Sequence, residues 1–371
     1  MSFKAILCQD RAIAFLQQAY AGDRVAHASI FAGSDGVGRF LTARAWAGLL
    51  LCMAPVEMEG LWENCGQCDA CRLMAAGTHP DFQHVYKELR EHTADGKGKA
   101  APVDLPIDVV REFLIAKVGH KPSLSPRRVF VVSEAEKLNI AGQNSLLKIL
   151  EEPPPECSII LLCTRLEKLL PTIRSRAQVL RFGPIDRTIV MDRLVEGGAA
   201  SPQARFFAGL AQGSLGAAWG FLNLAQAGAD LFTIKQALVA QMARARLEQV
   251  PSQVDACLAA GKQLAEAWAQ VETTTSKSDL TRRAQKTVVQ VYISVWDDVM
   301  KGPLGTSQEA IHADQVREIQ MLADRHGPAQ AAERVALGYE ALRRIEAAVN
   351  ERLVFEWLLL KSCGSGILPD L

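Results

Sequence analysis

The sequence predicts an α/β domain with a mostly parallel sheet, followed by a region built only from helices. Three observations support this prediction. Across residues 1–183, short apolar runs alternate with stretches of helical periodicity, which is the pattern of a parallel sheet with crossover helices. A glycine-rich loop follows the first of these runs. Beyond residue 183 the β-branched runs disappear, and alanine and leucine dominate.

Four apolar runs are expected to form the strands. The first, at 28–32, leads directly into the glycine-rich loop, and the segment 40–51 then has the periodicity of a helix. This strand–loop–helix order places the loop at the carboxyl edge of the sheet, where such folds bind ligands. Further strands are expected at 128–132, 158–163 and 179–182.

Gly183–Pro184 is the expected end of the α/β domain. A small helical unit is expected at 184–225, and a region of long helices at 226–371. Two segments, 91–102 and 273–278, have the composition of loops. The long helices are expected at 234–247, 253–271, 282–300 and 330–360.

The composition is that of an ordinary globular protein. Of the 371 residues, 49% are hydrophobic and 22% are charged, and the formal net charge is zero, so no general attraction to nucleic acid or membranes is expected. The first ten residues have no apolar core of a signal peptide, and no apolar run approaches the roughly 18 residues of a membrane span. We therefore expect a cytoplasmic protein whose nine cysteines are reduced or hold a metal.

The eight residues after the first strand read G-S-D-G-V-G-R-F and resemble a phosphate-binding loop. The loop pattern is G-x-x-x-x-G-K-[ST], and Gly33 and Gly38 occupy its two glycine positions, with Gly36 between them. Arg39 stands where the lysine belongs, and Phe40 where the magnesium-binding hydroxyl belongs. A phenyl ring cannot ligate magnesium, which requires oxygen ligands. The loop therefore predicts a nucleotide-binding fold that does not turn over nucleotide.

The second strand ends in a comparable alteration. An apolar strand followed by D-E-A-[DH] usually supplies an aspartate that acts on magnesium and a glutamate that activates water. Here Ser133 occupies the aspartate position, while Glu134 is kept. Two independent magnesium ligands are therefore missing, at Phe40 and at Ser133, and their joint loss favours a protein without hydrolytic activity.

A cysteine cluster between the first helix and residue 72 predicts one structural zinc ion. Three cysteines follow the spacing C-x-x-C-x-x-C, and a fourth precedes them. Four thiolates form a closed tetrahedral site with no open position for catalysis. Nearby His79 and His84 are alternatives for the fourth ligand, and an iron–sulfur cluster is a rival, although its usual C-x₃-C-P continuation is absent. The expected zinc ligands are Cys52, Cys65, Cys68 and Cys71.

The segment after the third strand reads T-R-L-E-K-L-L-P-T-I-R-S-R. It is expected to form a helix that Pro171 breaks. Arg174 and Arg176, which lie close together at its end, are either solvated surface charges or arginines that stabilise the γ-phosphate of a neighbouring subunit's nucleotide.

Several stretches together resemble one family. They are the altered loop, the cysteine cluster, T-H-P-D at 78–81, A-G-Q-N-S-L-L-K-I-L-E-E-P-P at 141–154, L-L-P-T-I-R-S-R at 169–176 and the last helical segment from 350 to 360. With these motifs the chain resembles the AAA+ clamp-loader subunits of bacterial DNA polymerase III, in particular the δ′ type.

The resemblance implies a RecA-like AAA+ module with a zinc-binding insertion at about 52–71, then a helical lid and a C-terminal collar that holds subunits in a ring. It implies that Arg176, with Ser175 beside it, is an arginine finger acting in trans. It also implies that Gly216 stands where active subunits carry a sensor arginine. Implied partners are γ/τ-type and δ-type subunits, the sliding clamp and, through the assembled complex, primer–template DNA.

The expected function is therefore that of a stator without ATPase activity of its own within the polymerase holoenzyme. The altered loop could still bind ATP or ADP without hydrolysis. One alternative is a weakly active γ/τ-type ATPase in which Arg39 replaces the lysine. Another is a zinc-knuckle protein that binds nucleic acid, which the acidic residues around the cysteines disfavour because such a knuckle should be basic. Weak candidates for DNA contact are Lys148, Arg282 and Arg283.

Overall fold

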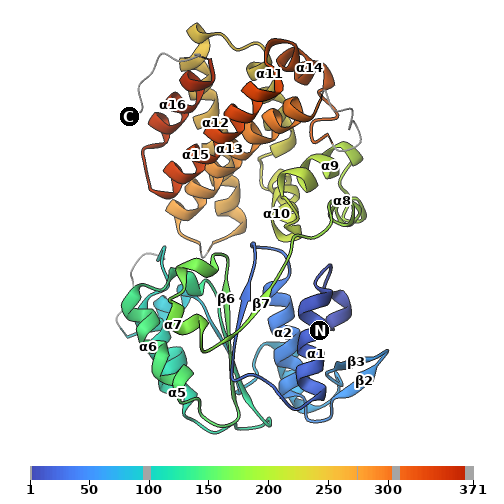
Figure 1. Cartoon of the computed structure of the whole chain (residues 1–371), viewed down its shortest axis with the longest axis vertical. Helices are drawn as coiled ribbons and strands as arrows, with labels where there is room; N and C mark the ends of the chain where they lie inside the picture. Colours follow the sequence, from blue (N-terminus) through green and yellow to red (C-terminus); the bar gives the residue numbers. More distant parts are fainter. Residues whose placement is uncertain (1, 95–101, 274, 303–309, 364–371) are drawn as a thin grey trace. The chain divides into compact units, whose positions relative to one another are not determined.

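The computed structural model describes residues 2–94, 102–273, 275–302 and 310–363 (Figure 1). The chain divides into two compact units. The first comprises residues 1–186 together with Ser214–Gly216, and the second comprises Arg187–Gly213 and Ala217–Leu371. Among the described residues, no helix combines the length and the apolar character that crossing a membrane requires.

A five-stranded sheet of order β4-β5-β6-β1-β7 forms the centre of the first unit. All its neighbouring strands are parallel. Its strands are β1 (Ala28–Ala32), β4 (Phe82–Val85), β5 (Arg128–Val132), β6 (Cys157–Cys163) and β7 (Gln178–Arg181). A separate antiparallel hairpin pairs β2 (Val56–Met58) with β3 (Leu61–Glu63).

Helices cover both faces of this sheet (Figure 1). On one side lie α1 (Asp10–Ala21) and α2 (Arg39–Leu51), and on the other lie α4 (Ile107–Val110), α5 (Ala116–Val118), α6 (Ile140–Glu151) and α7 (Pro171–Arg174). The remaining elements are the helix α3 (Asp69–Ala76), the π-helical turn η3 (Arg111–Ile115), and the 3-10 turns η1 (Phe3–Ala5), η2 (Lys87–His92), η4 (Ala135–Lys137) and η5 (Leu166–Lys168).

The alternation of side chains along the strands divides the apolar core into two layers. Ile30 and Phe130 pack into the layer under α4–α7, whereas the adjacent Phe31 and Val131 pack into the layer under α1 and α2. All four side chains are fully buried. Strands buried on both faces are continuous apolar runs, which explains why β1, β5 and β6 could be predicted from the sequence.

In its described residues, the second unit contains helices and no strand. Its elements are α8 (Arg187–Glu196), α9 (Ser201–Leu210), α10 (Leu215–Gln226), α11 (Leu231–Ala243), η6 (Leu247–Gln249), α12 (Val250–Val271), α13 (Lys277–Lys301), α14 (Val316–Arg325), α15 (Pro328–Glu346) and α16 (Glu351–Cys363). Leu215 and Gly216, at the start of α10, belong to the first unit. The predicted fold class, an α/β domain followed by helices, is confirmed.

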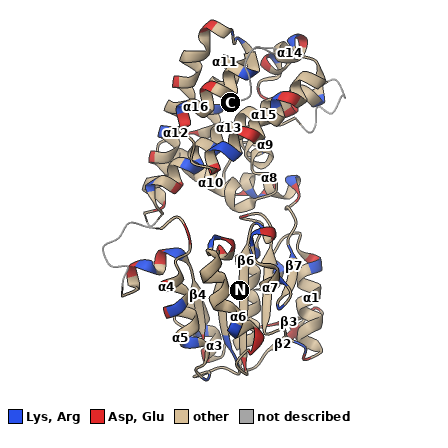
Figure 2. Cartoon of the chain, turned by 60° about the vertical axis from the view of Figure 1, so that its left-hand side comes forward, with Lys and Arg blue, Asp and Glu red and all other residues tan. Residues whose placement is uncertain are grey.

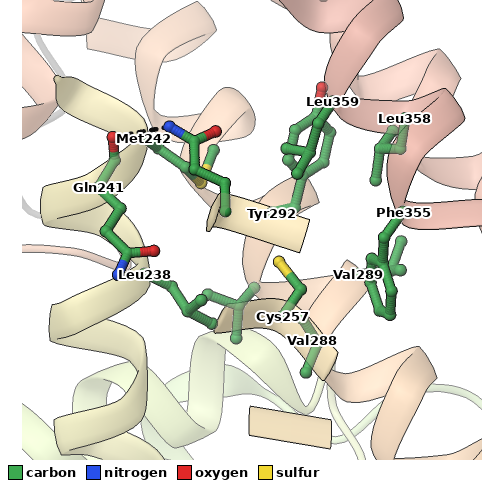
Figure 3. Close-up of a pocket in the computed structure, with 12 residues that line it drawn as sticks. Leu238, Gln241, Met242, Cys257, Val288, Val289, Tyr292, Phe355, Leu358 and Leu359 are labelled. Atoms are coloured by element: carbon green, nitrogen blue, oxygen red, sulfur yellow. Dashed lines mark hydrogen bonds between the residues drawn. The ribbon is translucent and has the colours of Figure 1, made fainter. Parts of the chain in front are cut away.

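A small apolar cavity lies among α11, α12, α13 and α16 (Figure 3). Its lining includes Leu238, Cys257, Tyr292 and Phe355. The cavity volume is about 20 Å³, which is room for about one water molecule. It is therefore a packing gap of the helical core and not a ligand site.

Several sequence predictions were wrong or incomplete. The strand β4 and the hairpin were missed, and Pro171 begins α7 at its first helical position instead of breaking a helix. The single helix expected at 330–360 is two helices, because Ala348 adopts a left-handed φ of 58° and the Asn350 side chain caps the next helix by accepting from the N–H of Arg352 at 3.0 Å. Of the loop expected at 91–102, residues 95–101 lie outside the described residues.

The buried carboxylate of Asp81, in the T-H-P-D motif, organises the base of the sheet. It is fully buried and accepts backbone N–H bonds from Ser123, Leu124 and Ser125 at 2.7–2.9 Å. It also pairs with Arg128 at 3.3 Å. Burial by itself raises the pKa of Asp81, but these hydrogen bonds outweigh burial and hold the pKa below its ordinary value. The motif therefore has a structural role.

We predict that Asp81→Asn lowers the free energy of unfolding by about 3 kcal/mol, because it leaves Arg128 and several buried N–H groups without a charged partner. Urea denaturation followed by circular dichroism measures this. The matched control is Asp23→Asn at an exposed position, where a left-handed φ of 48° suits asparagine.

The pH dependence of the free energy of unfolding should reflect the protonation of the Asp81 carboxylate. Because the folded-state pKa of Asp81 is lowered, its contribution to stability is present above the ordinary value of 3.8 and is lost as the pH falls through the folded-state pKa. An Asp81→Asn variant that is as stable as the unaltered chain would contradict the organising role of Asp81.

Candidate functional site

The altered loop and the end of β5 lie at the carboxyl edge of the sheet. The backbone ladder continues one residue beyond the strands: the Gly33 N–H donates to Cys163 O at 3.1 Å, and the Ser133 N–H donates to Val85 O at 2.9 Å. The positions of the loop and of Ser133 are therefore fixed by sheet hydrogen bonds. This is the edge at which parallel α/β folds bind ligands.

Glycines are required at two points of the loop. Gly36 and Gly38 have left-handed φ values of 73° and 103°, which side chains rarely adopt. Gly33 has a different constraint, because an added Cβ would lie 2.5 Å from Phe182 O. All three glycines therefore stand where a side chain would be strained or would clash.

Arg39 uses its charge inside the loop. Its guanidinium donates to Ser34 O at 3.1 Å and to the Asp35 carboxylate at 2.6 Å, and its side chain is only 8% exposed. Within the same unit, the Gly216 N–H donates to Gly36 O at 3.2 Å. The Arg39 guanidinium, the charged group of the loop that could face a phosphate, is therefore engaged by the chain itself.

An aromatic cluster occupies the region of the missing magnesium ligands. The Phe40 ring lies 4.6 Å from the His84 ring, which in turn lies 4.7 Å from Tyr86. His84 Nε2 is 2.8 Å from Ser133 Oγ. Burial, assisted by the charge of Arg44, lowers the pKa of His84 to about 4, so the ring is neutral at pH 7. Among Phe40, His84 and Ser133, the only side-chain oxygen is the Ser133 hydroxyl, and this hydroxyl bonds the His84 imidazole.

Glu134 is held by two lysines. Its carboxylate lies 2.5 Å from Lys137 Nζ and 3.5 Å from Lys87 Nζ, and Lys87 is buried. The residue has a left-handed φ of 52°, which is unusual for glutamate. The Glu134 carboxylate is therefore already engaged by two ammonium groups of the chain itself.

The four predicted cysteines lie together at the far end of α2. Their sulfurs all lie within 4.8 Å of one another, and three of the distances are 3.6–3.9 Å. A tetrahedron with zinc–sulfur bonds of about 2.3 Å has sulfurs about 3.8 Å apart. The four thiols therefore fit one tetrahedral metal ion. Cys52 belongs to the cluster, and neither His79 nor His84 does.

Backbone N–H groups direct three of these sulfurs. The N–H of Cys65 points to Cys52 Sγ at 3.2 Å, that of Cys68 to Cys65 Sγ at 3.4 Å, and that of Cys71 to Cys68 Sγ at 3.4 Å. Bonds from the N–H groups of Gln67 and Cys68 lower the pKa of Cys65 to about 6. Such bonds stabilise thiolates, which are the form that binds metal.

Arg176 lies in the turn that follows α7. Its side chain is 36% exposed and forms an ion pair of 2.9 Å with Glu151 at the end of α6. It also donates to Thr172 O at 3.0 Å and contacts Ser175 Oγ at 3.4 Å. The guanidinium is thus accessible and is held by a partner that is itself half exposed.

Sequence reasoning found the four cysteines, which lie together in the structure. It also found Phe40 of the loop and Ser133, which His84 links, and Glu134, which pairs with two lysines. It missed His84 as the partner of Ser133, Lys87 as the partner of Glu134, and Glu151 as the partner of Arg176. Apolar residues around a lone histidine at 82–85 were the available signal for His84.

Comparison with known proteins gives a consistent result. The family model described as DNA polymerase III, delta subunit, matches residues 8–186. The DNA polymerase III subunit delta' of Pseudomonas aeruginosa is 36% identical over 151 residues, 41% of each chain. That of Bacillus subtilis is 31% identical over 203 residues, 54% of this chain and 56% of the relative.

A DNA polymerase III subunit gamma/tau from Mycobacterium tuberculosis is 35% identical over 182 residues, 49% of this chain and 28% of the relative. The chain spans about half the length of the delta' relatives that it matches. Residues 8–186 thus match the DNA polymerase III delta-subunit family model, and the chain is similar in sequence to subunit delta' of DNA polymerase III.

Proposed function

We propose that the chain is the non-hydrolysing stator of a sliding-clamp loader in bacterial DNA replication. The observation that carries this proposal is the cluster of Phe40, His84 and Ser133. It replaces two oxygen ligands of magnesium with a phenyl ring and a hydroxyl that bonds a neutral imidazole. Without the metal, a nucleotide at this loop would lack the main stabiliser of the charge that develops during phosphoryl transfer.

Two further contacts support the absence of turnover. Glu134 is paired with Lys87 and Lys137, so its carboxylate is already engaged and not directed at a water molecule. The Arg39 guanidinium is paired with Asp35 and does not replace a free lysine. ATP or ADP binding would have to rely on the loop backbone, without hydrolysis.

In this role Arg176 acts in trans. It is accessible, and its planar fork suits a phosphate held by an adjacent γ/τ-type subunit. Ring closure around the sliding clamp would require γ/τ-type and δ-type partners, and primer–template DNA would be contacted by the assembled complex. The proposed location is the cytoplasm, where replication takes place in bacteria.

The cysteine cluster would hold one structural zinc ion. Four thiol ligands leave no open position, so the metal would supply cross-linking between α2, the hairpin and α3 and no catalysis. The similarity to a gamma/tau subunit supports a second candidate, a weakly active ATPase motor.

We expect the purified chain to show no ATP hydrolysis. In a loader reconstituted with γ/τ-type and δ-type subunits, clamp and primed DNA, Arg176→Ala should leave assembly intact. It should slow hydrolysis at the site that receives the finger by on the order of 10³-fold. Single-turnover ATPase measurements test this, with Arg24→Ala, at an exposed position, as the control.

Unchanged hydrolysis with Arg176→Ala, in a ring that still assembles, would refute the trans role. Turnover by the chain alone would instead establish the motor candidate.

A second prediction concerns the partner of Arg176. Because a half-exposed ion pair contributes about 0–1 kcal/mol, Glu151→Gln should free the finger and raise hydrolysis by the loader by at most about fivefold. The neighbouring Glu152→Gln, also exposed, is the control. A decrease as large as that of Arg176→Ala would show instead that Glu151 positions the finger for reaction.

Removal of the metal gives a third prediction. Mass spectrometry of the purified chain should find about one zinc per chain, and Cys71→Ser should reduce this to none because a thiolate ligand is lost. The temperature of unfolding should fall at the same time. Cys363→Ser, at an exposed thiol outside the cluster, should keep the zinc. Full zinc content in Cys71→Ser would contradict the assignment.

A further inference from the structure

A groove runs along the free edge of β7 in the first unit. Its volume is about 600 Å³. Residues of α1 form one wall, residues of η5 and α7 form the other, and Val179, Leu180 and Arg181 of β7 lie between them. Figure 2 shows β7 between α7 and α1. The groove is therefore a slot at the sheet margin, between the helices that cover the two faces.

The strand β7 has a neighbour on one side only. It is last in the sheet order and pairs with β1. The Phe182 N–H donates toward β1, to Ala32 O at 2.7 Å. Because backbone groups point alternately to the two sides of a strand, those of Val179 and Arg181 face the groove. Edge strands with such outward groups are templates for pairing with another chain.

The groove carries an uncompensated positive charge. Arg11 from α1, Arg174 from α7 and Arg181 from β7 line it, and no acidic residue does. In the described part of the chain, none of the three forms an ion pair. Arg174 Nε is buried and has no hydrogen-bond partner there. An anionic occupant would pair with the exposed guanidinium groups of Arg11 and Arg181.

Apolar side chains lie between these arginines. Phe15 of α1 is 41% exposed, and Leu166 and Val179 are half-buried. An extended peptide presents side chains alternately to opposite faces, so it could pack apolar residues on these and place carboxylates near the arginines. A nucleic acid fits less well, because phosphates accept hydrogen bonds but donate none to the outward carbonyls of β7.

We propose that this groove binds an extended acidic segment of another protein, which adds to the sheet as a strand beside β7. Backbone hydrogen bonds would supply part of the affinity, and Arg11, Arg174 and Arg181 would select carboxylates. This goes beyond the proposed stator function. The argument uses neither Arg176 nor the altered loop, although Arg174 and Ser175 of the groove directly precede Arg176 in the chain.

The probe for a binding test is a fluorescein-labelled peptide of alternating glutamate and valine, and fluorescence anisotropy with the full chain at low salt is the measurement. Its counterpart, with lysine in place of glutamate, should not bind. The double variant Arg11→Glu and Arg181→Glu should weaken binding of the glutamate peptide by about tenfold or more, because like charges then oppose each other. Arg24→Glu, outside the groove, should change it by less than about twofold.

Hydrogen–deuterium exchange of the unaltered chain gives a readout that does not depend on how the variants fold. The glutamate peptide should protect the amides of Val179 and Arg181. Three results would overturn the proposal: no binding at about 1 mM peptide, binding without protection in β7, or binding that survives the double charge reversal. Tighter binding of an eight-nucleotide single-stranded thymidine probe at β7 would assign the groove to nucleic acid instead.

Discussion

The hydrogen-bond ladder of the parallel sheet is the constraint on which the rest of the first unit depends. It extends past the strand ends, through Gly33 N–H to Cys163 O and Ser133 N–H to Val85 O. These bonds fix where the glycine loop and the end of β5 meet. The altered residues therefore lie at the sheet edge where parallel α/β folds bind ligands, and the proposed lack of hydrolysis would come from side chains and not from a distorted backbone.

The changes at this edge stabilise one another. The Phe40 ring packs against the ring of His84. His84 in turn bonds the Ser133 hydroxyl, so the three side chains form one cluster. Restoring one ligand alone would thus leave the metal site incomplete and disturb a packed cluster.

The sequence was most informative where burial is complete. The bounds of β1 and β5 were predicted correctly because both strands are continuous apolar runs. The strand β4 was missed because Gln83 and His84 interrupt its apolar pattern at the sheet margin. The ion pair of Arg176 with Glu151 joins a residue in the turn after α7 to one at the end of α6, 25 positions apart, and no local pattern specifies such a contact. The four cysteines, by contrast, are close in sequence, so their spacing was enough to predict that their sulfurs lie together.

The order of the strands has a consequence for how the chain folds as it is made. β1 is among the first elements synthesised, yet both of its neighbours, β6 and β7, follow more than a hundred residues later. One edge of β1 therefore stays unpaired until residue 163 has left the ribosome, and the other until residue 181 has done so, and both are exposed to aggregation until then. The cysteine cluster lies within 20 consecutive residues, Cys52 to Cys71, and needs none of those later strands to assemble.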